Sequence, residues 1–222
     1  MSIGLSIHPV RCRPAADLVE SFRPLATTCL SDAMNRLCGV TGLRRYDSAG
    51  KLLGTAFTVK TRPGDNLMVH KALDLAAPGD VLVVDGGGDV TNALVGELLG
   101  MYARSRGLRG FVVDGAIRDS AWFEGFPCYA RANVHRGPYK DGPGEINVPV
   151  TVGGLVITPG DIVVGDEDGV LAIRPDEAAR VLALAEEKAR EEERIKRAIV
   201  EGRWDRSWID AALSAKGVTT SR

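Results

Sequence analysis

The triplet Pro-Gly-Asp occurs three times in the chain, at residues 63–65, 78–80 and 159–161. Proline fixes the backbone angle φ that a turn needs, and glycine allows the positive φ of the next position, so each triplet marks a change of chain direction. The second and third triplets stand directly before the apolar runs VLVVD (81–85) and IVVG (162–165). Short apolar runs bounded by turn residues are typical of buried strands. We therefore expect a sheet built from many short segments.

Strand-like segments alternate with helical ones early in the chain, and strand-like segments dominate later, which predicts an α/β fold with more than one sheet layer. No segment resembles a linker, so residues 1–222 are predicted to form one domain. The predicted helices span 15–23, 30–37, 66–76, 97–106, 118–124 and 176–200. The predicted strands span 54–61, 81–85, 111–114, 127–134, 148–152, 162–165 and 170–173. Residues 176–222, which end in a short amphipathic piece, are expected to pack on a neighbouring subunit.

The charge balance excludes one class of partner. Lys and Arg number 28 against 29 Asp and Glu, which gives a net charge of −1. Proteins that bind nucleic acid through phosphate contacts usually carry a basic excess, so no nucleic-acid partner is predicted. No apolar run approaches the roughly 18 residues of a membrane helix. Without a secretory pattern in Met1–Cys12 or a paired-cysteine motif, we expect a cytoplasmic protein with reduced thiols and no membrane partner.

The hexapeptide DGAIRD (114–119) is the densest candidate site. It follows the predicted strand 111–114, and open α/β sheets bind ligands at the carboxyl ends of their strands. The Asp119 carboxylate offers the oxygen ligands that Mg²⁺ and Mn²⁺ prefer. The Arg118 guanidinium offers paired donors to a carboxylate or an enolate. From these residues alone, a helix-capping aspartate beside a surface arginine explains the pattern equally well.

A second candidate is the segment Gly96-Glu97-Leu98-Leu99, where a helix is expected to begin. Unpaired N–H groups at a helix start bind anions, so these amides could hold the carboxylate of a small acid. The helix dipole would also favour Glu97 in the first turn. Taken alone, an ordinary first-turn glutamate is the simpler interpretation.

The run VDGGGD (84–89) raises a nucleotide-binding alternative, such as the cofactor loop of a methyltransferase or a dehydrogenase. Its spacing differs from G-x-G-x-x-G, and no glycine-rich turn leads straight into a helix. A tight turn at the end of a strand is therefore the preferred interpretation.

The predicted helix 176–200 carries one stripe of residues at helical spacing. The stripe is apolar as far as Ala189 and then presents the Glu192 carboxylate. The charge pairs of EEKAREEERIKR (186–197) fit a solvated helix end. The alternative is that Glu192 points into a neighbouring subunit, which these residues alone do not favour.

With these motifs the chain resembles the class II pyruvate aldolases that cleave 4-hydroxy-4-methyl-2-oxoglutarate and 4-carboxy-4-hydroxy-2-oxoadipate. Those enzymes share their fold with the RraA-type regulators of ribonuclease activity. The resemblance runs from about residue 27 to residue 202 and rests on the order and spacing of seven motifs. They are LSDAMNR (30–36), PGDN (63–66), GELL (96–99), DGAIRD (114–119), NVPV (147–150), TPGD (158–161) and DEDGV (166–170).

The resemblance implies an RraA-like swivelling α/β/β domain with a long C-terminal helix, assembled as trimers or pairs of trimers. In the aldolases twenty residues separate an acidic residue from an Arg-Asp pair, as they separate Glu97 from Arg118 here. By this match Asp119 binds the metal, Arg118 contacts the 2-keto oxygen, and the amides of Gly96 to Leu99 hold the pyruvate carboxylate. The late glutamate of the family, which the adjacent subunit supplies, falls at Glu192.

The implied activity is that of a divalent-metal-dependent lyase. It cleaves 4-hydroxy-2-keto diacids to pyruvate and a second keto acid, and it decarboxylates oxaloacetate as a side activity. The implied partners are a small 2-keto acid, Mg²⁺ or Mn²⁺, and further copies of the chain in a trimer or hexamer.

A non-catalytic, protein-binding regulator of the RraA type is the main alternative. Asp119, which the regulators lack, and the long helix beyond their last strand both favour the aldolases. Glu97 does not discriminate, because the characterised aldolases have aspartate there and the regulators can carry glutamate. A demethylmenaquinone methyltransferase is disfavoured because the nucleotide fingerprint is missing.

Overall fold

The computed structural model describes residues 3–218. Its helices are α1 (Ala16–Glu20), α2 (Thr27–Ala33), α3 (Leu67–Leu75), α4 (Glu97–Ser105), the 3-10 helix η1 (Ser120–Gly125), α5 (Ala178–Val200) and α6 (Ser207–Ala215). Its strands are β1 (Leu5–Ile7), β2 (Arg44–Arg45), β3 (Leu52–Thr61), β4 (Asp80–Asp85), β5 (Ala93–Val95), β6 (Gly110–Ile117), β7 (Cys128–Asn133), β8 (Gly144–Ile146), β9 (Val150–Val152), β10 (Leu155–Ile157), β11 (Ile162–Asp166) and β12 (Gly169–Ile173).

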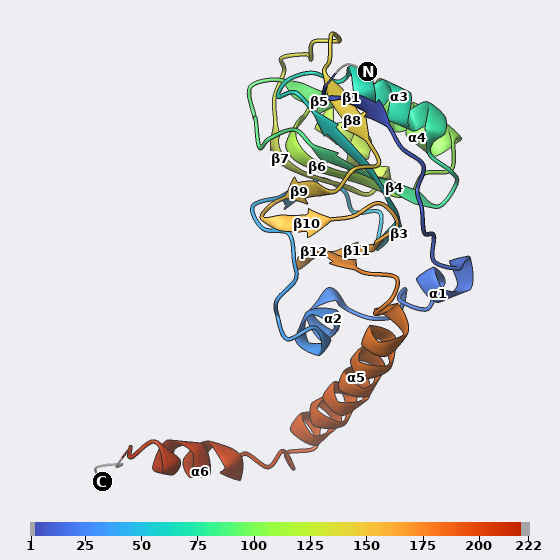
Figure 1. The fold of residues 1–222 in the computed structure, drawn as a ribbon. Helices are drawn as coiled ribbons and strands as arrows, with labels where there is room; N and C mark the ends of the chain where they lie inside the picture. Colours follow the sequence, from blue (N-terminus) through green and yellow to red (C-terminus); the bar gives the residue numbers. More distant parts are fainter. Residues whose placement is uncertain (1–2, 219–222) are drawn as a thin grey trace.

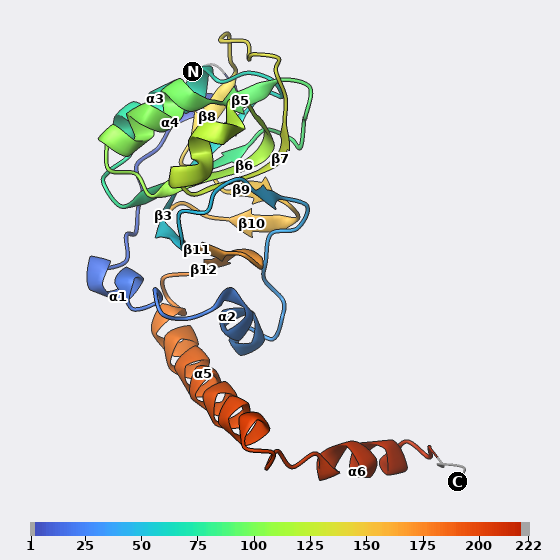
Figure 2. The same ribbon diagram turned by 180° about the vertical axis from the view of Figure 1, so that it is seen from behind.

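A mixed sheet forms the centre of the molecule, with the strand order β1-β8-β3-β4-β6-β7-β2. Strands β11 and β12 extend it from β3, β5 joins it beside β6, and β9 and β10 form a separate hairpin. Helices α3 and α4 cover one face, and the β9–β10 hairpin lies on the other (Figures 1 and 2). Helices α2 and α5 close a third apolar layer beyond β11 and β12. The predicted α/β class with several layers is confirmed.

Strand β3 connects these layers. All of its residues except Lys60 are buried, as expected for a strand covered on both faces. Its first residues pair antiparallel with β11, where Thr55 faces Ile162, and its later residues pair parallel with β4. The β-branched run that predicted a strand at 54–61 therefore marks the middle of the fold.

Two predicted helices are placed differently. The helix expected at 30–37 begins at Thr27 and ends at Ala33, because Asn35 and Arg36 take left-handed backbone conformations with φ of 57° and 60°. The helix expected from Arg118 begins two residues later, because β6 continues to Ile117 through its pairing with β5 and β7. Strands of two or three residues, such as β2 and β5, escaped prediction because they are too short to show a period.

The long C-terminal helix is confirmed as α5, and the amphipathic piece after it forms α6. Figures 1 and 2 show α5 leaving the sheet at the end opposite α3 and α4, with α6 projecting beyond it. None of the helices within residues 3–218 is long and apolar enough to cross a bilayer.

Candidate active site

Strands β5 and β6 bring the two predicted motifs together. They pair in parallel, with Ala93 beside Ala116 and Val95 beside Ile117, so both end at the same edge of the sheet. The amide of Arg118 donates to the carbonyl of Val95 at 3.0 Å and locks this register. Helix α4 begins directly after β5, so its N-terminus faces the residues that follow β6.

Three of the predicted site residues meet at this edge. The backbone amide of Glu97 donates to Oδ2 of Asp119 at 3.2 Å. The same Oδ2 lies 3.6 Å from Nε of Arg118. A Cβ atom on Gly96 would lie 2.7 Å from Oδ2 of Asp119 and 2.8 Å from Cγ of Arg118, so only glycine permits this approach. Glu97, Arg118 and Asp119 therefore form one cluster with the start of α4.

The backbone at Asp119 argues against a simple capping role. This residue precedes η1 in a left-handed conformation with φ of 54° and makes no side-chain capping hydrogen bond. Non-glycine residues adopt this conformation infrequently, and aspartate is among those that tolerate it. The carboxylate accepts from the amide of Glu97 on α4 instead. Asp119 therefore stands at the N-cap position of η1, while its carboxylate binds the first amide of α4 and none of η1.

A small pocket of about 120 Å³ adjoins the cluster. It is far smaller than the roughly 300–1,000 Å³ of sites for drug-sized ligands, so a small acid suits it. Arg118 lines it together with Gly96, Leu98 and Leu99 of the predicted amide segment. The other lining residues are Asn66, His70, Ala93, Leu94, Val95, Pro138 and Lys140.

Three polar residues of this pocket were missed in the sequence. Asn66 is buried, and its Nδ2 donates to the carbonyl of Leu94 at 2.9 Å while its Oδ1 has no partner in the described part of the chain. His70 and Lys140 approach from α3 and from the segment before β8. The four-residue spacing of Asn66 and His70 at the start of a helix was the available signal.

Burial lowers the pKa of His70, and the nearby positive charge of Lys140 lowers it further. The imidazole is therefore neutral at pH 7 and can both donate and accept a hydrogen bond. Lys140 and Arg118 are then the two cationic side chains that line the pocket. Two cations at a small pocket suit a ligand with two carboxylates.

Glu192 lies elsewhere. It is half-buried on α5, with Oε2 3.5 Å from the Sγ atom of Cys29 on α2. Figures 1 and 2 place α5 at the far end of the molecule from α4 and the end of β6. Within one chain, Glu192 is therefore separated from Arg118 and Asp119.

The Asp119 carboxylate has the chemistry of a magnesium ligand. Its side chain is 47% exposed, and the amide hydrogen bond from Glu97 leaves most of its lone pairs available. No group of three or more His, Cys, Asp or Glu side chains that could hold an ion occurs within residues 3–218. Mg²⁺ usually keeps several waters and binds through one or two carboxylates plus substrate oxygens. A single carboxylate beside a substrate pocket is consistent with this mode of Mg²⁺ coordination.

The glycine run at 86–88 forms a turn, as the sequence indicated. The Asp85 carboxylate accepts from the amides of Gly87 and Thr151, and the Asp114 carboxylate accepts from Gly153 and pairs with Arg131. Strand β5 follows this turn, and no helix begins there. These carboxylates hold loops together.

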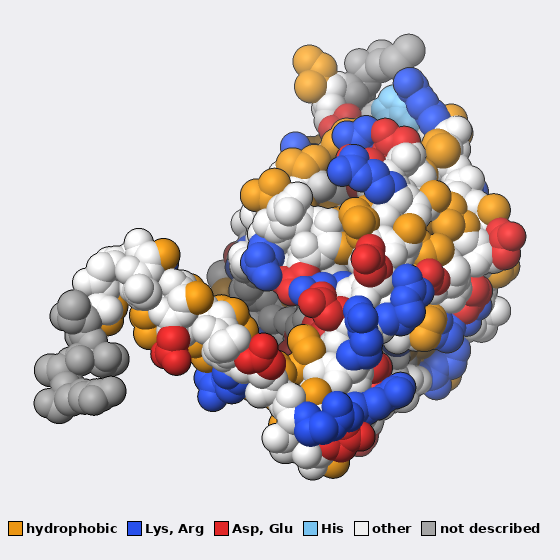
Figure 3. Space-filling model, turned by 90° about the horizontal axis from the view of Figure 1, so that it is seen from below, with side chains coloured by type: hydrophobic (Ala, Val, Ile, Leu, Met, Phe, Trp, Pro, Cys, Tyr) orange, Lys and Arg blue, Asp and Glu red, His pale blue; other side chains and the backbone are white. Residues whose placement is uncertain are grey.

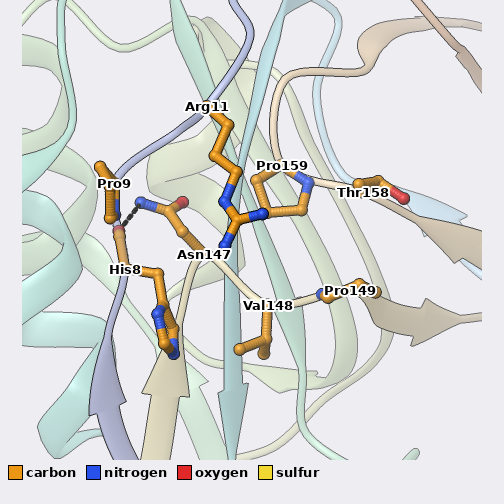
Figure 4. A pocket seen from close by; sticks show the side chains of 8 residues that line it. All are labelled: His8, Pro9, Arg11, Asn147, Val148, Pro149, Thr158 and Pro159. Atoms are coloured by element: carbon orange, nitrogen blue, oxygen red, sulfur yellow. Dashed lines mark hydrogen bonds between the residues drawn. The ribbon is translucent and has the colours of Figure 1, made fainter.

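A larger pocket of about 350 Å³ lies away from this cluster (Figure 4). Three prolines and Val148 make much of its wall. The side chain of Asn147 at its edge donates to the carbonyl of His8 at 2.8 Å, which ties the N-terminal segment to the chain after β8. None of the predicted site residues lines this pocket, so we assign no chemistry to it.

Comparison with known proteins relates the chain to one family. Residues 27–172 match the RraA-like family described as Aldolase/RraA. The chain is 41% identical over 186 residues to "Putative 4-hydroxy-4-methyl-2-oxoglutarate aldolase" from Halalkalibacterium halodurans, covering 82% of this chain and 89% of that protein.

Two solved structures share the fold. An uncharacterised protein from Pseudomonas syringae superimposes with a TM-score of 0.77 at 26% identity, covering 86% of this chain and 96% of its own. RraAS2 of Streptomyces coelicolor, an unusual member of the RNase ES inhibitor RraA family, superimposes with a TM-score of 0.75 at 28% identity, covering 82% and 96%. Since the family match spans both site motifs and most of the sheet, the chain belongs to the Aldolase/RraA family.

Proposed function

We propose that the protein is a divalent-metal-dependent lyase that cleaves 4-hydroxy-2-keto diacids to pyruvate and a second keto acid. The observation that carries this proposal is the cluster of Arg118, Asp119 and the Glu97 amide beside a small pocket. The name of the relative from Halalkalibacterium halodurans supports the same class of reaction.

The keto-acid end of the substrate is assigned to the start of α4. The amides of Gly96 to Leu99 would hold the carboxylate, because N–H groups in a first helical turn have no partner within the helix. The amide of Glu97 already donates to Asp119, so the amides of Leu98 and Leu99 are the main donors that we assign. Asp119 would hold Mg²⁺ or Mn²⁺, which when bound supplies Lewis-acid polarisation of the 2-keto group. Arg118 would donate to the 2-keto oxygen, where negative charge develops.

The reaction breaks the C3–C4 bond. Its electron pair moves to C3 and is delocalised onto the C2 oxygen as an enolate, which Arg118 stabilises. The C4 hydroxyl loses its proton and becomes the carbonyl of the second keto acid, and protonation of C3 completes pyruvate. We assign the proton movements to Glu97 and to Glu192 of a neighbouring copy. Oxaloacetate decarboxylation reaches the same enolate without a base, so it should appear as a side activity.

The distal end of the substrate is assigned to the other wall of the pocket. The Lys140 ammonium would pair with the second carboxylate. Neutral His70 adds a hydrogen-bonding group without a second charge. This arrangement favours a hydroxylated diacid over a simple keto acid.

We further propose that the chain functions as a homo-oligomer, a trimer or hexamer. No residue of α6 is buried, and Trp208 on it and Trp204 before it are 62% and 40% exposed. Figure 3 shows hydrophobic side chains along this projecting segment. A second copy is the occupant we assign, because α5, the helix before this segment, carries Glu192, which the site lacks within one chain.

A coupled assay with lactate dehydrogenase tests the function. We expect pyruvate release from 4-hydroxy-4-methyl-2-oxoglutarate and from oxaloacetate when Mg²⁺ or Mn²⁺ is added, and none in EDTA. Full turnover after careful metal stripping, or trapping of a lysine adduct by borohydride, would contradict the metal-dependent mechanism.

The second candidate is a non-catalytic regulator, favoured by the structural likeness to RraAS2. The same assay separates the two, because a regulator would release no pyruvate under any metal condition.

A further inference from the structure

The three Pro-Gly-Asp triplets place their aspartates differently. All three carboxylates are buried, with Asp65, Asp80 and Asp161 at most 5% exposed. Asp80 accepts from the amide of Ala77 at 2.9 Å, and Asp161 accepts from that of Thr158 at 2.8 Å. Each of these two carboxylates closes its own turn, three residues back, and that of Asp80 also pairs with the Arg13 guanidinium.

The Asp65 carboxylate differs in that it accepts from backbone amides of a distant segment. Its Oδ2 accepts from the amides of Asp141 at 2.7 Å and Gly142 at 3.0 Å, and its Oδ1 accepts from the amide of Leu67 at 3.0 Å. Nη2 of Arg62 lies 3.2 Å from Oδ2. One buried carboxylate therefore joins the start of α3 to a segment more than seventy residues later.

That segment carries a wall of the candidate active site. Pro138 and Lys140 line the small pocket, and Tyr139 between them pairs with the turn through two backbone hydrogen bonds, to Gly64 and Asn66. In the described part of the chain, the Lys140 ammonium makes no ion pair or side-chain hydrogen bond within the fold. Its position is therefore set by its backbone, which the hydrogen bonds of Tyr139 hold on one side and the Asp65 carboxylate holds on the other.

We propose that Asp65 is a positioning residue that holds the Lys140 segment against the pocket and thereby sets the preference for a substrate with a second carboxylate. This inference rests on the proposed function. Asp65 itself is fully buried and does not line the pocket. Its carboxylate acts through the amides of Asp141 and Gly142, which flank Lys140 on its C-terminal side.

Two substrates and a matched control test the proposal. The substrates are 4-hydroxy-4-methyl-2-oxoglutarate, a diacid, and 4-hydroxy-2-oxopentanoate, which lacks the distal carboxylate. We expect Asp65→Asn to lower the ratio of the two kcat/KM values, diacid over monoacid, by about tenfold, the effect of one charge-assisted hydrogen bond. Asp161→Asn removes an equally buried turn carboxylate far from the pocket, and it should leave the ratio as in the wild type.

A double-mutant cycle links the effect to the lysine. Lys140→Gln should lower the same ratio, and adding Asp65→Asn to it should lower the ratio no further, because the two changes remove one interaction. If Asp65→Asn does not fold, Asp65→Glu replaces it as the test. Glutamate keeps the charge but is longer by one methylene, so it should displace the Lys140 segment and lower the same ratio of kcat/KM values.

An unchanged ratio in the Asp65 variants, or equal losses for both substrates, would show a purely structural role and overturn the inference. Full additivity of the two changes would overturn it as well. If the wild type releases pyruvate from neither substrate, the proposed function itself fails, which is a separate result.

Discussion

Arg118 and Asp119 are adjacent and oppositely charged, yet their roles in the cluster differ. Asp119 accepts from an amide at the start of α4, where the helix dipole favours a negative group. Arg118 extends along the pocket, and a Cβ on Gly137 would lie 3.1 Å from its Nη1. The guanidinium is therefore closely confined on that side. Its planar pair of donors makes it the group we assign to the enolate.

Replacing Arg118 by lysine tests this assignment. Lysine keeps the charge but loses the planar, paired donors. We expect Arg118→Lys to lower kcat by about 100- to 1,000-fold, by analogy with the loss of an oxyanion-hole donor. Metal affinity, measured by calorimetry, should change far less. Arg104→Lys, at the other end of α4, is the control, and a kcat for Arg118→Lys within a few-fold of wild type would remove Arg118 from the enolate.

Gly96 provides a steric test of the cluster. An added methyl would lie within 2.8 Å of both Asp119 Oδ2 and Arg118 Cγ, so one of these groups has to move. A misplacement of about 1 Å can lower a rate roughly 100-fold, and we expect Gly96→Ala to lose activity on that scale. Gly125→Ala is the matched control, since its Cβ would meet only the end of the Arg104 side chain at 3.4 Å. Equal activity of the two variants would argue against the site.

The hydrogen bonds that the Asp65 carboxylate accepts from Leu67, Asp141 and Gly142 form what we call the Asp65 clamp. The clamp should make the free energy of unfolding depend on pH. Burial opposes ionisation of Asp65, but the amides of Leu67, Asp141 and Gly142 and the charge of Arg62 outweigh it and lower its pKa. A carboxyl with a lowered folded pKa adds stability that is present above its unfolded pKa, about 3.9. That stability is lost as the pH falls through the folded pKa.

We therefore expect the difference in unfolding free energy between wild type and Asp65→Asn to be largest near neutral pH and to shrink below about pH 4. Urea unfolding of both proteins at pH 7 and pH 3 measures it. A difference that stays constant over this range would mean that the Asp65 charge does not contribute to folding.

At the scale of elements, the sheet and the C-terminal helices differ in what supports them. Strands β3, β4 and β6 lie in the core, whereas α5 buries only Ala178, Val181 and Ala185 near its start. A nine-residue helix such as α6 is marginal on its own, because isolated helices shorter than about 12 residues gain too little from propagation. We therefore expect α6 to pack on a partner surface.

Removal of residues 203–222 tests that requirement. We expect the thermal unfolding of the sheet to change little, because no residue of α6 is buried in its own chain. Self-association should weaken by at least about 100-fold, since burying one tryptophan removes roughly 150–250 Å² from water. Mass photometry across a dilution series measures it, with a Trp204→Ala and Trp208→Ala double variant as the full-length comparison. An unchanged oligomer would show that this segment does not mediate assembly.

At the scale of the whole molecule, two of the proposed site carboxylates are far apart. Asp119, the proposed metal ligand, lies beside Arg118, whereas Glu192 lies at the other end of the fold. A neighbouring copy resolves this separation if its α5 reaches the pocket. The site would then exist only in the assembly, and assembly and activity would be lost together on dilution.

Subunit complementation tests this arrangement. Inactive Arg118→Ala protein and inactive Glu192→Ala protein are mixed under conditions that allow subunit exchange. If Glu192 acts in trans, some interfaces receive both intact groups and activity recovers partially. If it acts within one chain, every site lacks one group and activity stays at the parental level. A fully active Glu192→Ala parent would assign Glu192 to the solvated charge pattern of α5.

Local patterns in the sequence determined the class of fold. The apolar runs after the Pro-Gly-Asp turns became β4 and β11, and the amphipathic stripe became α5, because burial periodicity and turn chemistry act over a few residues. The motifs GELL and DGAIRD were also visible as candidates, since helix starts and strand ends carry local signals.

Tertiary structure decided which candidates meet. Parallel pairing of β5 with β6 joined Glu97 to Asp119, although β5 has only three residues and shows no pattern of its own. The same holds for Asn66 and Lys140, which the Asp65 clamp brings together from distant segments. Identical Pro-Gly-Asp triplets also carry carboxylates with different partners, because a buried carboxylate accepts from whichever amides the fold places beside it.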